Sequence, residues 1–286
     1  MTKILITGSN GQLGNSIKDL SSEYSDYEFT YTDIEELDIA NIIELEDFFL
    51  DKGFKFVINC AAYTAVDKAE EEYEKALLIN SHAVKNLAET CSKNNAFLVH
   101  ISTDYVFNGK NFSPYNESDE TCPASSYGRS KLSGEKEIIN AGIKSVIIRT
   151  SWLYSEFGHN FVKTMLKYGR ERESLNIVCD QVGTPTYSRD LAKSILEIIS
   201  QTDDIKKPEI FNYSNEGAIS WYDFAKAVME ISGIECNIMP IETSDYPLPA
   251  PRPPYSVLNK TKIKKRFNIE IPYWKDSLRE CIQLFD

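Results

Sequence analysis

The chain has 286 residues, of which 42% are hydrophobic and 26% charged, and its formal net charge is −12. This composition is typical of a globular protein with a sizeable core. A chain this acidic has no general attraction for nucleic acid or for anionic membranes, so we expect neither as a partner.

The cysteines and the first residues indicate a cytoplasmic protein. The six cysteines are scattered without a C-x-x-C pair, which favours reduced thiols. The apolar run in MTKILITG is too short for a signal peptide, and no apolar run is long enough to span a membrane. The three histidines lie far apart in the sequence, and without zinc-ligand spacing we predict no metal site.

The first half of the chain alternates between strand and helix patterns. Apolar runs predict strands at 3–7, 27–33, 54–62, 96–102 and 145–150, and helical patterns lie at about 12–21, 40–53, 66–93 and 127–140. Such alternation with short connections predicts a Rossmann-like α/β fold, a doubly wound parallel sheet with helices on both faces.

The second half is less regular. Its patterns predict helices at 159–171, 188–200, 220–232, 259–267 and 274–285, and strands at 175–180 and 209–214. Residues 244–256 contain five prolines and no helical period, which predicts a fixed, extended loop.

These patterns divide the chain into two expected units. We expect residues 1–150 to form a dinucleotide-binding domain, to which residues 178–215 return. Residues 151–177 and 216–286 would form a smaller C-terminal α/β substrate-binding lobe. Ligands of open α/β sheets bind at the carboxyl edge of the strands, so we expect the site in the crevice between the two units.

A glycine-rich turn, GSNGQLG, follows the first predicted strand and opens the first helix. Gly8, Gly11 and Gly14 permit a tight turn and a close approach of a pyrophosphate to the backbone. The helix N-terminus adds free N–H groups and a positive dipole end. We therefore predict a dinucleotide site here, the alternative being a tight turn that binds no ligand.

An acidic residue is expected about twenty residues later to bind the ribose hydroxyls. Asp33, at the end of the second predicted strand, fits this position. Its carboxylate would repel the additional phosphate of NADP, which favours NADH, although some such sites accept both cofactors. The alternative is that Asp33 only closes a strand end.

Tyr127 and Lys131 are four residues apart at the start of a predicted helix, so their side chains share one face. An ammonium group near a phenol lowers the pKa of the phenol, and a general acid works best when its pKa is near the operating pH. The pair therefore suits proton transfer beside a nicotinamide. Alone it is also typical of a solvated helix face.

Thr103 follows the buried strand at 96–102. Its hydroxyl would lie at the carboxyl edge of the sheet, where it could hydrogen-bond a substrate carbonyl. The alternative is a hydroxyl that closes the strand end.

With these elements in this order, the chain resembles the extended short-chain dehydrogenase/reductase superfamily. Within it, the chain is similar to the dTDP-4-dehydrorhamnose reductase family, whose signature blocks resemble NCAAYTAVDKAE, STDYVFNG, YGRSKLSGEK, IIRTSWLY, NFVKTML, DQVGTPTY and WYDFA. The resemblance runs nearly end to end and includes the proline-rich loop.

The resemblance implies reduction of the C4 keto group of dTDP-4-dehydro-L-rhamnose by NADH or NADPH, which gives dTDP-L-rhamnose. Tyr127 would protonate the C4 oxygen, and Lys131 would lower the pKa of Tyr127 and hold the nicotinamide ribose. Thr103 would orient the carbonyl, while Asp104 and Trp152 would contact the sugar. The implied cofactor-binding residues are Gly8, Asn10, Gly11, Gln12, Leu13, Gly14, Asp33, Asp38, Ile39, Ala61, Ala62, Tyr63, Thr64, Tyr127 and Lys131.

Two features separate this chain from relatives in the superfamily. Sugar dehydratases usually carry a glutamate after the aspartate, where this chain has Tyr105, which favours simple carbonyl reduction. Some reductases dimerise through magnesium held by glutamates, where this chain has Asn15, Ser16 and Arg189. We therefore predict no such metal, and a monomer or a weak dimer without the magnesium bridge.

Two other functions stay open at this point. One is a nucleotide-sugar epimerase or dehydratase that keeps NAD tightly bound. The other is a non-catalytic regulatory subunit similar to the beta subunit of methionine adenosyltransferase. The sequence also leaves open which residues bind the dTDP pyrophosphate, with Arg252 and Lys163 as candidates.

Overall fold

Six parallel strands form the central sheet of the computed structural model, which describes residues 1–285. The strands lie in the order β10-β5-β4-β3-β1-β2, and every neighbouring pair is parallel. Their bounds are β1 Thr2–Thr7, β2 Tyr27–Thr32, β3 Phe56–Asn59, β4 Phe97–Thr103, β5 Ser145–Thr150 and β10 Pro208–Asn212. The chain reverses direction across the sheet between β1 and β3, which is where such sheets bind ligands.

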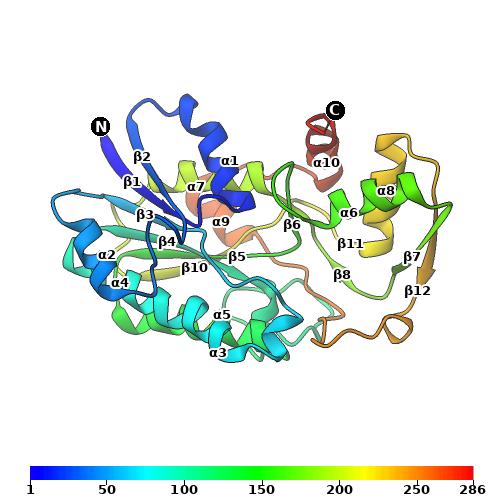
Figure 1. Ribbon diagram of the computed structural model, residues 1–286, viewed down its shortest axis with the longest axis horizontal. Coiled ribbons are helices and arrows are strands. Elements are labelled where there is room, and N and C mark those ends of the chain that lie inside the picture. The colour runs from blue at the N-terminus through cyan, green and yellow to red at the C-terminus, as the bar shows by residue number, and fades with distance from the viewer. Residues whose placement is uncertain (286) are drawn as a thin grey trace.

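The sheet is covered by helices on both faces (Figure 1), which confirms the predicted Rossmann-like fold. The strands are apolar on both faces because each face packs against helices. One face packs against α1 (Gln12–Leu20), α7 (Ser188–Ile199) and α9 (Thr261–Phe267). The other packs against α2 (Ile42–Phe49), α4 (Ala83–Lys93) and α5 (Ser126–Ala141).

A further hydrophobic cluster, separate from those on the two faces of the sheet, lies in a smaller lobe at the right of Figure 1. It contains α6 (Phe161–Glu171), α8 (Trp221–Ser232) and α10 (Trp274–Gln283), together with the parallel pair β7 (Ser174–Val178) and β12 (Asn237–Ile241). Strand β12 was not predicted, because Pro240 and its mostly exposed residues hide any strand period.

Short strands and single helical turns complete the fold. Strand β6 (Leu153–Tyr154) pairs with β9 (Thr186–Tyr187), and β8 (Val182–Gly183) pairs with β11 (Ile219–Ser220). The short 3-10 turns are η1 Ser21–Glu23, η2 Lys68–Glu70, η4 Asp104–Val106 and η5 Thr243–Asp245.

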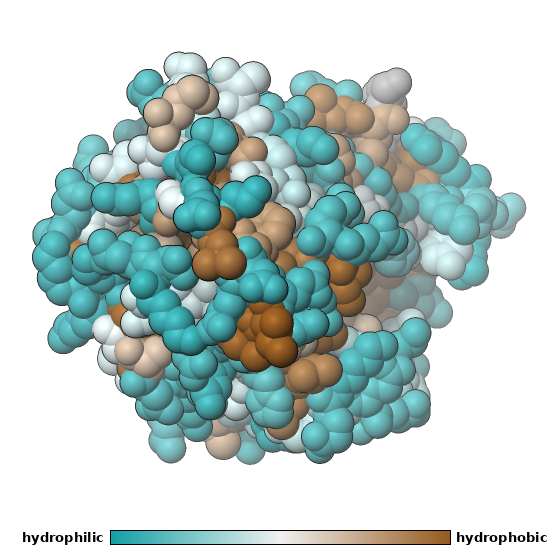
Figure 2. Space-filling view, turned by 60° about the vertical axis from the view of Figure 1, so that its left-hand side comes forward, coloured by the Kyte–Doolittle hydropathy of each residue, from teal (hydrophilic) through white to brown (hydrophobic). Residues whose placement is uncertain are grey.

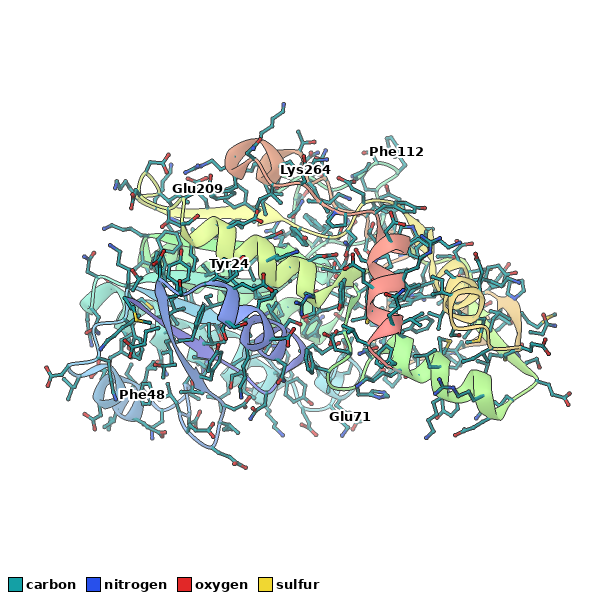
Figure 3. The ribbon with its side chains drawn as sticks, turned by 90° about the horizontal axis from the view of Figure 1, so that it is seen from above. Tyr24, Phe48, Glu71, Phe112, Glu209 and Lys264 are labelled. Carbon is teal, nitrogen blue, oxygen red and sulfur yellow. The ribbon has the colours of Figure 1, made fainter. Side chains whose placement is uncertain are left out.

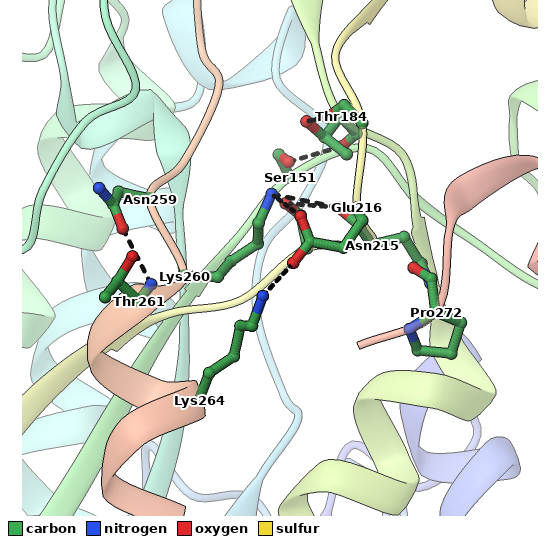
Figure 4. A network of polar contacts seen from close by, with 11 residues as sticks. Ser151, Thr184, Asn215, Glu216, Asn259, Lys260, Thr261, Lys264 and Pro272 are labelled. Carbon is green, nitrogen blue, oxygen red and sulfur yellow. Dashed lines mark hydrogen bonds and ion pairs between the residues drawn. The ribbon is translucent and has the colours of Figure 1, made fainter. Parts of the chain in front are cut away.

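The expected division into two units stays a prediction. Helix α9 packs differently from the unit to which its residues were assigned. Helix α9 falls in the range assigned to the lobe, yet Ile263 and Phe267 pack in the core of the sheet. Two lysines hold its start in place, because Lys260 and Lys264 contact the carboxylate of Glu216 at 3.4 and 2.7 Å (Figure 4).

The helix predicted at 66–93 is broken into pieces. After η2 come α3 (Tyr73–Leu77), a π-helical turn at Leu78–His82 and then α4. Within the π turn, the side chain of Asn80 bonds to the backbone of Tyr63 and to Ser130. Single π turns inside helices are often found at functional sites, and this one supports the loop after β3.

The surface is mostly hydrophilic on the face shown in Figure 2, with small separate hydrophobic patches. Phe112, between β4 and α5, is 95% exposed and points outward (Figure 3). Within residues 1–285, we find no helix that is long and apolar enough to cross a membrane.

Candidate active site

The glycine turn presses against the loop that follows β3. Gly8 has a φ of 66°, and a Cβ there would lie 2.5 Å from the backbone nitrogen of Ala61. A Cβ at Gly14 would lie 2.5 Å from the Cα of Ser9. Both positions therefore require glycine, and the tight packing brings the turn and Ala61 together at the carboxyl edge of the sheet.

Helix α1 begins at Gln12 with Gly11 as its N-cap, and no side chain in the described part of the chain caps it. Its first turn carries no acidic residue. The first N–H groups are therefore available to an anion, as a dinucleotide pyrophosphate requires.

The side chains of two residues of this turn make contacts within the protein. Leu13 is buried in the core, so only its backbone can face a cofactor. The side chain of Gln12 reaches the smaller lobe, where its Oε1 accepts hydrogen bonds from Ser155 (3.0 Å) and Asn160 (3.1 Å). Gln12 thus joins the start of α1 to Asn160, the residue that caps α6.

Asp33 lies beside the glycine turn. Its Oδ2 accepts a hydrogen bond from the backbone N–H of Asn10 at 2.9 Å, and its Oδ1 accepts one from Ile34 at 2.9 Å. The carboxylate is thereby held at the end of β2, where a ribose would lie. The Oδ1 of Asp38 accepts from the N–H of Ala40 at 2.9 Å, whereas the side chain of Ile39 is buried in the core.

The loop after β3 is anchored by a residue that the sequence did not reveal. Asn80 accepts a hydrogen bond from the N–H of Tyr63 at 2.9 Å and donates one to its carbonyl at 3.0 Å. Ala61, Ala62 and Tyr63 are partly exposed and Thr64 is exposed, so all four can border a cofactor.

Tyr127 is placed by the start of α5. Ser125 caps the helix, and its Oγ accepts from the N–H of Gly128 at 3.1 Å. Glu70, a residue missed from the sequence, accepts from the N–H and the hydroxyl of Ser126 at 2.8 and 2.7 Å. A Cβ at Gly128 would lie 2.3 Å from the carbonyl oxygen of Tyr105, so glycine allows the helix to approach the end of β4.

The pKa of Tyr127 is raised to about 12, opposite to the expected direction. Burial raises this pKa most, a hydrogen bond with Thr103 partly offsets the rise, and the charge of Asp104 adds to it. The phenol therefore keeps its proton at neutral pH, as a general acid would need to.

Lys131 does not lower the pKa of Tyr127 as expected, because its ammonium group is bonded elsewhere. The side chain is buried, and its Nζ donates to the carbonyl of Ile101 at 2.6 Å. Burial lowers the pKa of Lys131 to about 8, and Glu135 and Cys60 partly oppose the shift. Among the described residues, Thr103 and Asp104 act on the pKa of Tyr127, and Lys131 is not one of the causes.

Asp104 and Thr103 form a buried polar pair next to Tyr127. The hydroxyl of Thr103 donates to Oδ1 of Asp104 at 3.0 Å, while Oδ2 of Asp104 is buried and without a partner in residues 1–285. Burial raises the pKa of Asp104 to about 6, and the neighbouring hydroxyls of Ser256 and Thr103 partly offset the rise. An unpartnered acceptor of this kind suits a hydroxyl of a bound sugar.

Trp152 follows β5 and stacks on Trp221 of α8, with ring centroids 3.6 Å apart and planes 11° apart. Trp221 was not recognised as a site residue, although the aromatic block WYDFA after a helix-capping serine contained the signal.

The proline-rich loop lies against this site, and its cation is already paired. Arg252 makes a bidentate contact with Asp67, both hydrogen bonds being 2.7 Å. Lys163, the other candidate for the pyrophosphate, has its Nζ over the ring of Phe285 at 5.6 Å. The structure therefore favours neither as a free cation at the site.

Arg189 occupies the region where the resemblance suggested a metal bridge in relatives. Its guanidinium contacts Asp19 and lies 3.7 Å from Glu23. Across residues 1–285, no group of three or more His, Cys, Asp or Glu side chains is placed to hold a metal ion.

Comparison with known proteins is consistent with this geometry. The family model described as RmlD substrate binding domain matches residues 1–286. The spore coat polysaccharide biosynthesis protein SpsK of Bacillus subtilis is 41% identical over 99% of this chain and 98% of its own. The dTDP-4-dehydrorhamnose reductase of Aggregatibacter actinomycetemcomitans is 39% identical over 98% of each chain.

A solved structure extends the likeness to three dimensions. The dTDP-4-dehydrorhamnose reductase of Bacillus anthracis, solved in complex with NADP, is 36% identical with a TM-score of 0.94. The alignment covers 99% of this chain and 100% of that one. The resemblance read from the sequence blocks is thereby confirmed, and the chain belongs to the RmlD family, which contains the dTDP-4-dehydrorhamnose reductases.

Proposed function

We propose that this protein reduces the C4 carbonyl of dTDP-4-dehydro-L-rhamnose with NADH or NADPH, giving dTDP-L-rhamnose. The observation that carries the proposal is the grouping of three residues at the carboxyl end of β4, where Thr103 donates to Asp104 at 3.0 Å and both act on the pKa of Tyr127. These residues would thus supply a proton donor, a carbonyl-orienting hydroxyl and a sugar acceptor beside the predicted dinucleotide turn. The identities of the relatives support the same activity.

The cofactor would lie along the glycine turn, Asp33 and the loop after β3, and would supply the hydride to C4. Thr103 would hold the carbonyl oxygen by a hydrogen bond. Tyr127 would donate its phenolic proton to that oxygen, which leaves a phenolate. A buried phenolate needs a nearby cation. Lys131 lies one helical turn away and would approach it by exchanging its bond to Ile101 for one to the cofactor ribose and the phenolate.

We propose that NADH is the preferred cofactor. Two backbone N–H groups hold the carboxylate of Asp33 at the end of β2, where it would meet the additional phosphate of NADPH with like charge. The relative from Bacillus anthracis was solved with NADP, so the rates with both cofactors must be compared.

The first experiment follows the nicotinamide absorbance. The substrate is made in situ from dTDP-glucose with a dehydratase and an epimerase, and NADH and NADPH are supplied in turn. Consumption that requires both this protein and the epimerised sugar supports the reductase. A purified protein that retains NAD and consumes no reduced cofactor would instead indicate an epimerase or dehydratase.

Tyr127→Phe tests the proton donor in the same assay. The change removes the hydroxyl and keeps the ring, so we expect kcat to fall by about 10²–10⁴ while NADH still binds. Tyr222→Phe, on the half-buried start of α8, is the matched control. A Tyr127→Phe variant with the wild-type rate would contradict the assignment.

We also propose that the protein acts in the cytoplasm as a monomer or a weak dimer without a magnesium bridge. The six cysteines within the described residues are free thiols, and Arg189 is paired with acidic residues of its own chain. Sedimentation with and without a chelator tests the oligomeric state, and a dimer that dissociates on chelation would contradict the proposal.

A further inference from the structure

Trp152 has a strained backbone. Its φ of 48° lies in the left-handed region, which a bulky residue seldom adopts outside special sites. Backbone strain of this kind persists only where the surrounding structure imposes it, and it is concentrated at ligand-binding and catalytic sites. The residues that hold Trp152 in this conformation are therefore candidates for a binding site.

Two features from distant segments enclose the indole of Trp152. Trp221 stacks on one of its faces, with centroids 3.6 Å apart, and Phe161 backs Trp221 at 4.7 Å. Gly183 lies against its edge, because a Cβ there would be 2.6 Å from Cε2 and 2.7 Å from Cζ2. Gly183 has no positive φ, so glycine is needed for the space that the indole fills.

Strand β8 brings these parts together. Ile219 of β11 pairs with Gly183, which sets Trp221 two residues further along at the start of α8. On the other side of β8, Val182 exchanges two backbone hydrogen bonds of 2.8 Å with the proline-rich loop, one to Pro254 and one from Ser256. Loop, strand and helix thus form one support around Trp152.

The support extends towards Tyr127 through neighbouring residues. A Cβ at Gly183 would also lie 2.8 Å from Oγ of Ser256, and Ser256 lies close enough to Asp104 to lower the pKa of its carboxyl. Asp104 in turn contacts Thr103, which contacts Tyr127. The indole therefore lies near Asp104 and Thr103, the residues proposed to contact the sugar and its carbonyl.

We propose that Trp221 and Gly183 are positioning residues that hold Trp152 as an apolar wall for the deoxysugar. This inference rests on the proposed function. A 6-deoxy sugar presents a methyl group and C–H faces, which pack on a flat indole, while its hydroxyls reach Asp104. Stacking on Trp221 and the space left by the missing side chain of Gly183 hold the indole in the orientation in which the sugar can pack on it.

The test separates substrate binding from chemistry. Trp221→Leu removes the stacking partner, and Gly183→Ala places a methyl group where the indole lies. From the energy of one aromatic pair, we expect each variant to raise KM for the dTDP-sugar roughly two- to tenfold. We expect kcat and NADH affinity to change little. Trp221→Phe keeps a ring in the stack and should restore most of the loss.

Lys226→Ala, an exposed position on the same helix, is the matched control. Near-ultraviolet circular dichroism checks the stack directly, because two indoles this close couple their transitions. Trp221→Phe should remove the coupled signal, and Trp274→Phe, away from the pair, should keep it. Active variants with wild-type KM would overturn the inference, whereas a wild-type protein without reductase activity would overturn the proposed function instead.

Discussion

The carboxylate of Asp104 combines burial with an unpartnered oxygen within residues 1–285, an arrangement that destabilises a folded protein. Burial also raises the pKa of this carboxyl, because the buried site disfavours the charged form. Perturbed buried groups of this kind are most common at functional sites, and the other proposed site residues, Thr103 and Tyr127, lie beside Asp104.

Asp104→Asn should stabilise the ligand-free protein at neutral pH. The pKa of Asp104 rises from 3.8 to about 6 on folding, chiefly by burial, so the folded state binds the proton more tightly. The resulting contribution to stability is present below pH 3.8 and is lost as the pH rises through about 6. An uncharged amide avoids that loss, which is on the order of 3 kcal/mol at pH 8.

Urea unfolding at pH 4 and pH 8 measures the effect. The variant should exceed the wild type at the higher pH and approach it at the lower, while KM for the dTDP-sugar rises. Asp276→Asn, an exposed carboxylate on α10, is the control and should show no such change with pH. A difference between Asp104→Asn and wild type that is equal at both pH values would contradict the pKa of Asp104.

At the scale of elements, α5 is placed by its glycines more than by its helix-forming residues. Gly128 lets its first turn reach the end of β4, and Gly134 lets its middle reach the π turn. A Cβ at Gly134 would lie 2.1 Å from the carbonyl oxygen of Asn80. Because Asn80 anchors the loop after β3, one close approach positions both Tyr127 and the expected cofactor loop.

Gly134→Ala is therefore expected to destabilise the protein, although alanine favours helices. The methyl group would meet backbone that cannot rotate away, so α5 must move, and overpacking of this kind costs about 1–3 kcal/mol. We expect lower thermal stability together with weaker NADH binding. Lys136→Ala, an exposed position two residues along the same helix, should change neither. An unchanged melting temperature in Gly134→Ala would show that the two elements can separate freely.

At the scale of the whole molecule, the proline-rich loop connects the two sides of the site. It pairs with β8 of the smaller lobe, and through Arg252 it holds Asp67 in the loop after β3. The contact is bidentate, and the side chain of Arg252 is 16% exposed, so it is stronger than an ordinary surface ion pair. The loop thus acts as a clamp that joins the smaller lobe to the loop after β3.

Arg252→Ala should loosen this clamp more than it destabilises the fold. We expect proteolysis within 244–256 to become faster and KM for the dTDP-sugar to rise, while global stability changes by about 1 kcal/mol or less. Limited proteolysis and urea unfolding measure the two effects. The control is Arg279→Ala, which removes an exposed ion pair on α10. Equal proteolysis rates in wild type and Arg252→Ala would show that prolines alone hold the loop.

The sequence by itself determined the parallel sheet, the glycine turn and the positions of Thr103 and Tyr127. Each of these follows from rules of short range: apolar runs, glycines between a strand and a helix, and residues at strand or helix ends. The family could be read for the same reason, because its signature blocks are local.

Only the tertiary structure decided the direction in which Lys131 points, the protonation of Asp104 and Tyr127, and the stack of Trp152 on Trp221. A pKa depends on burial and on neighbours that are distant in the sequence. A side chain's direction depends on what fills the space around it. Residue spacing along the chain predicts neither the pKa values nor the side-chain directions, because folding brings the relevant neighbours together from separate elements.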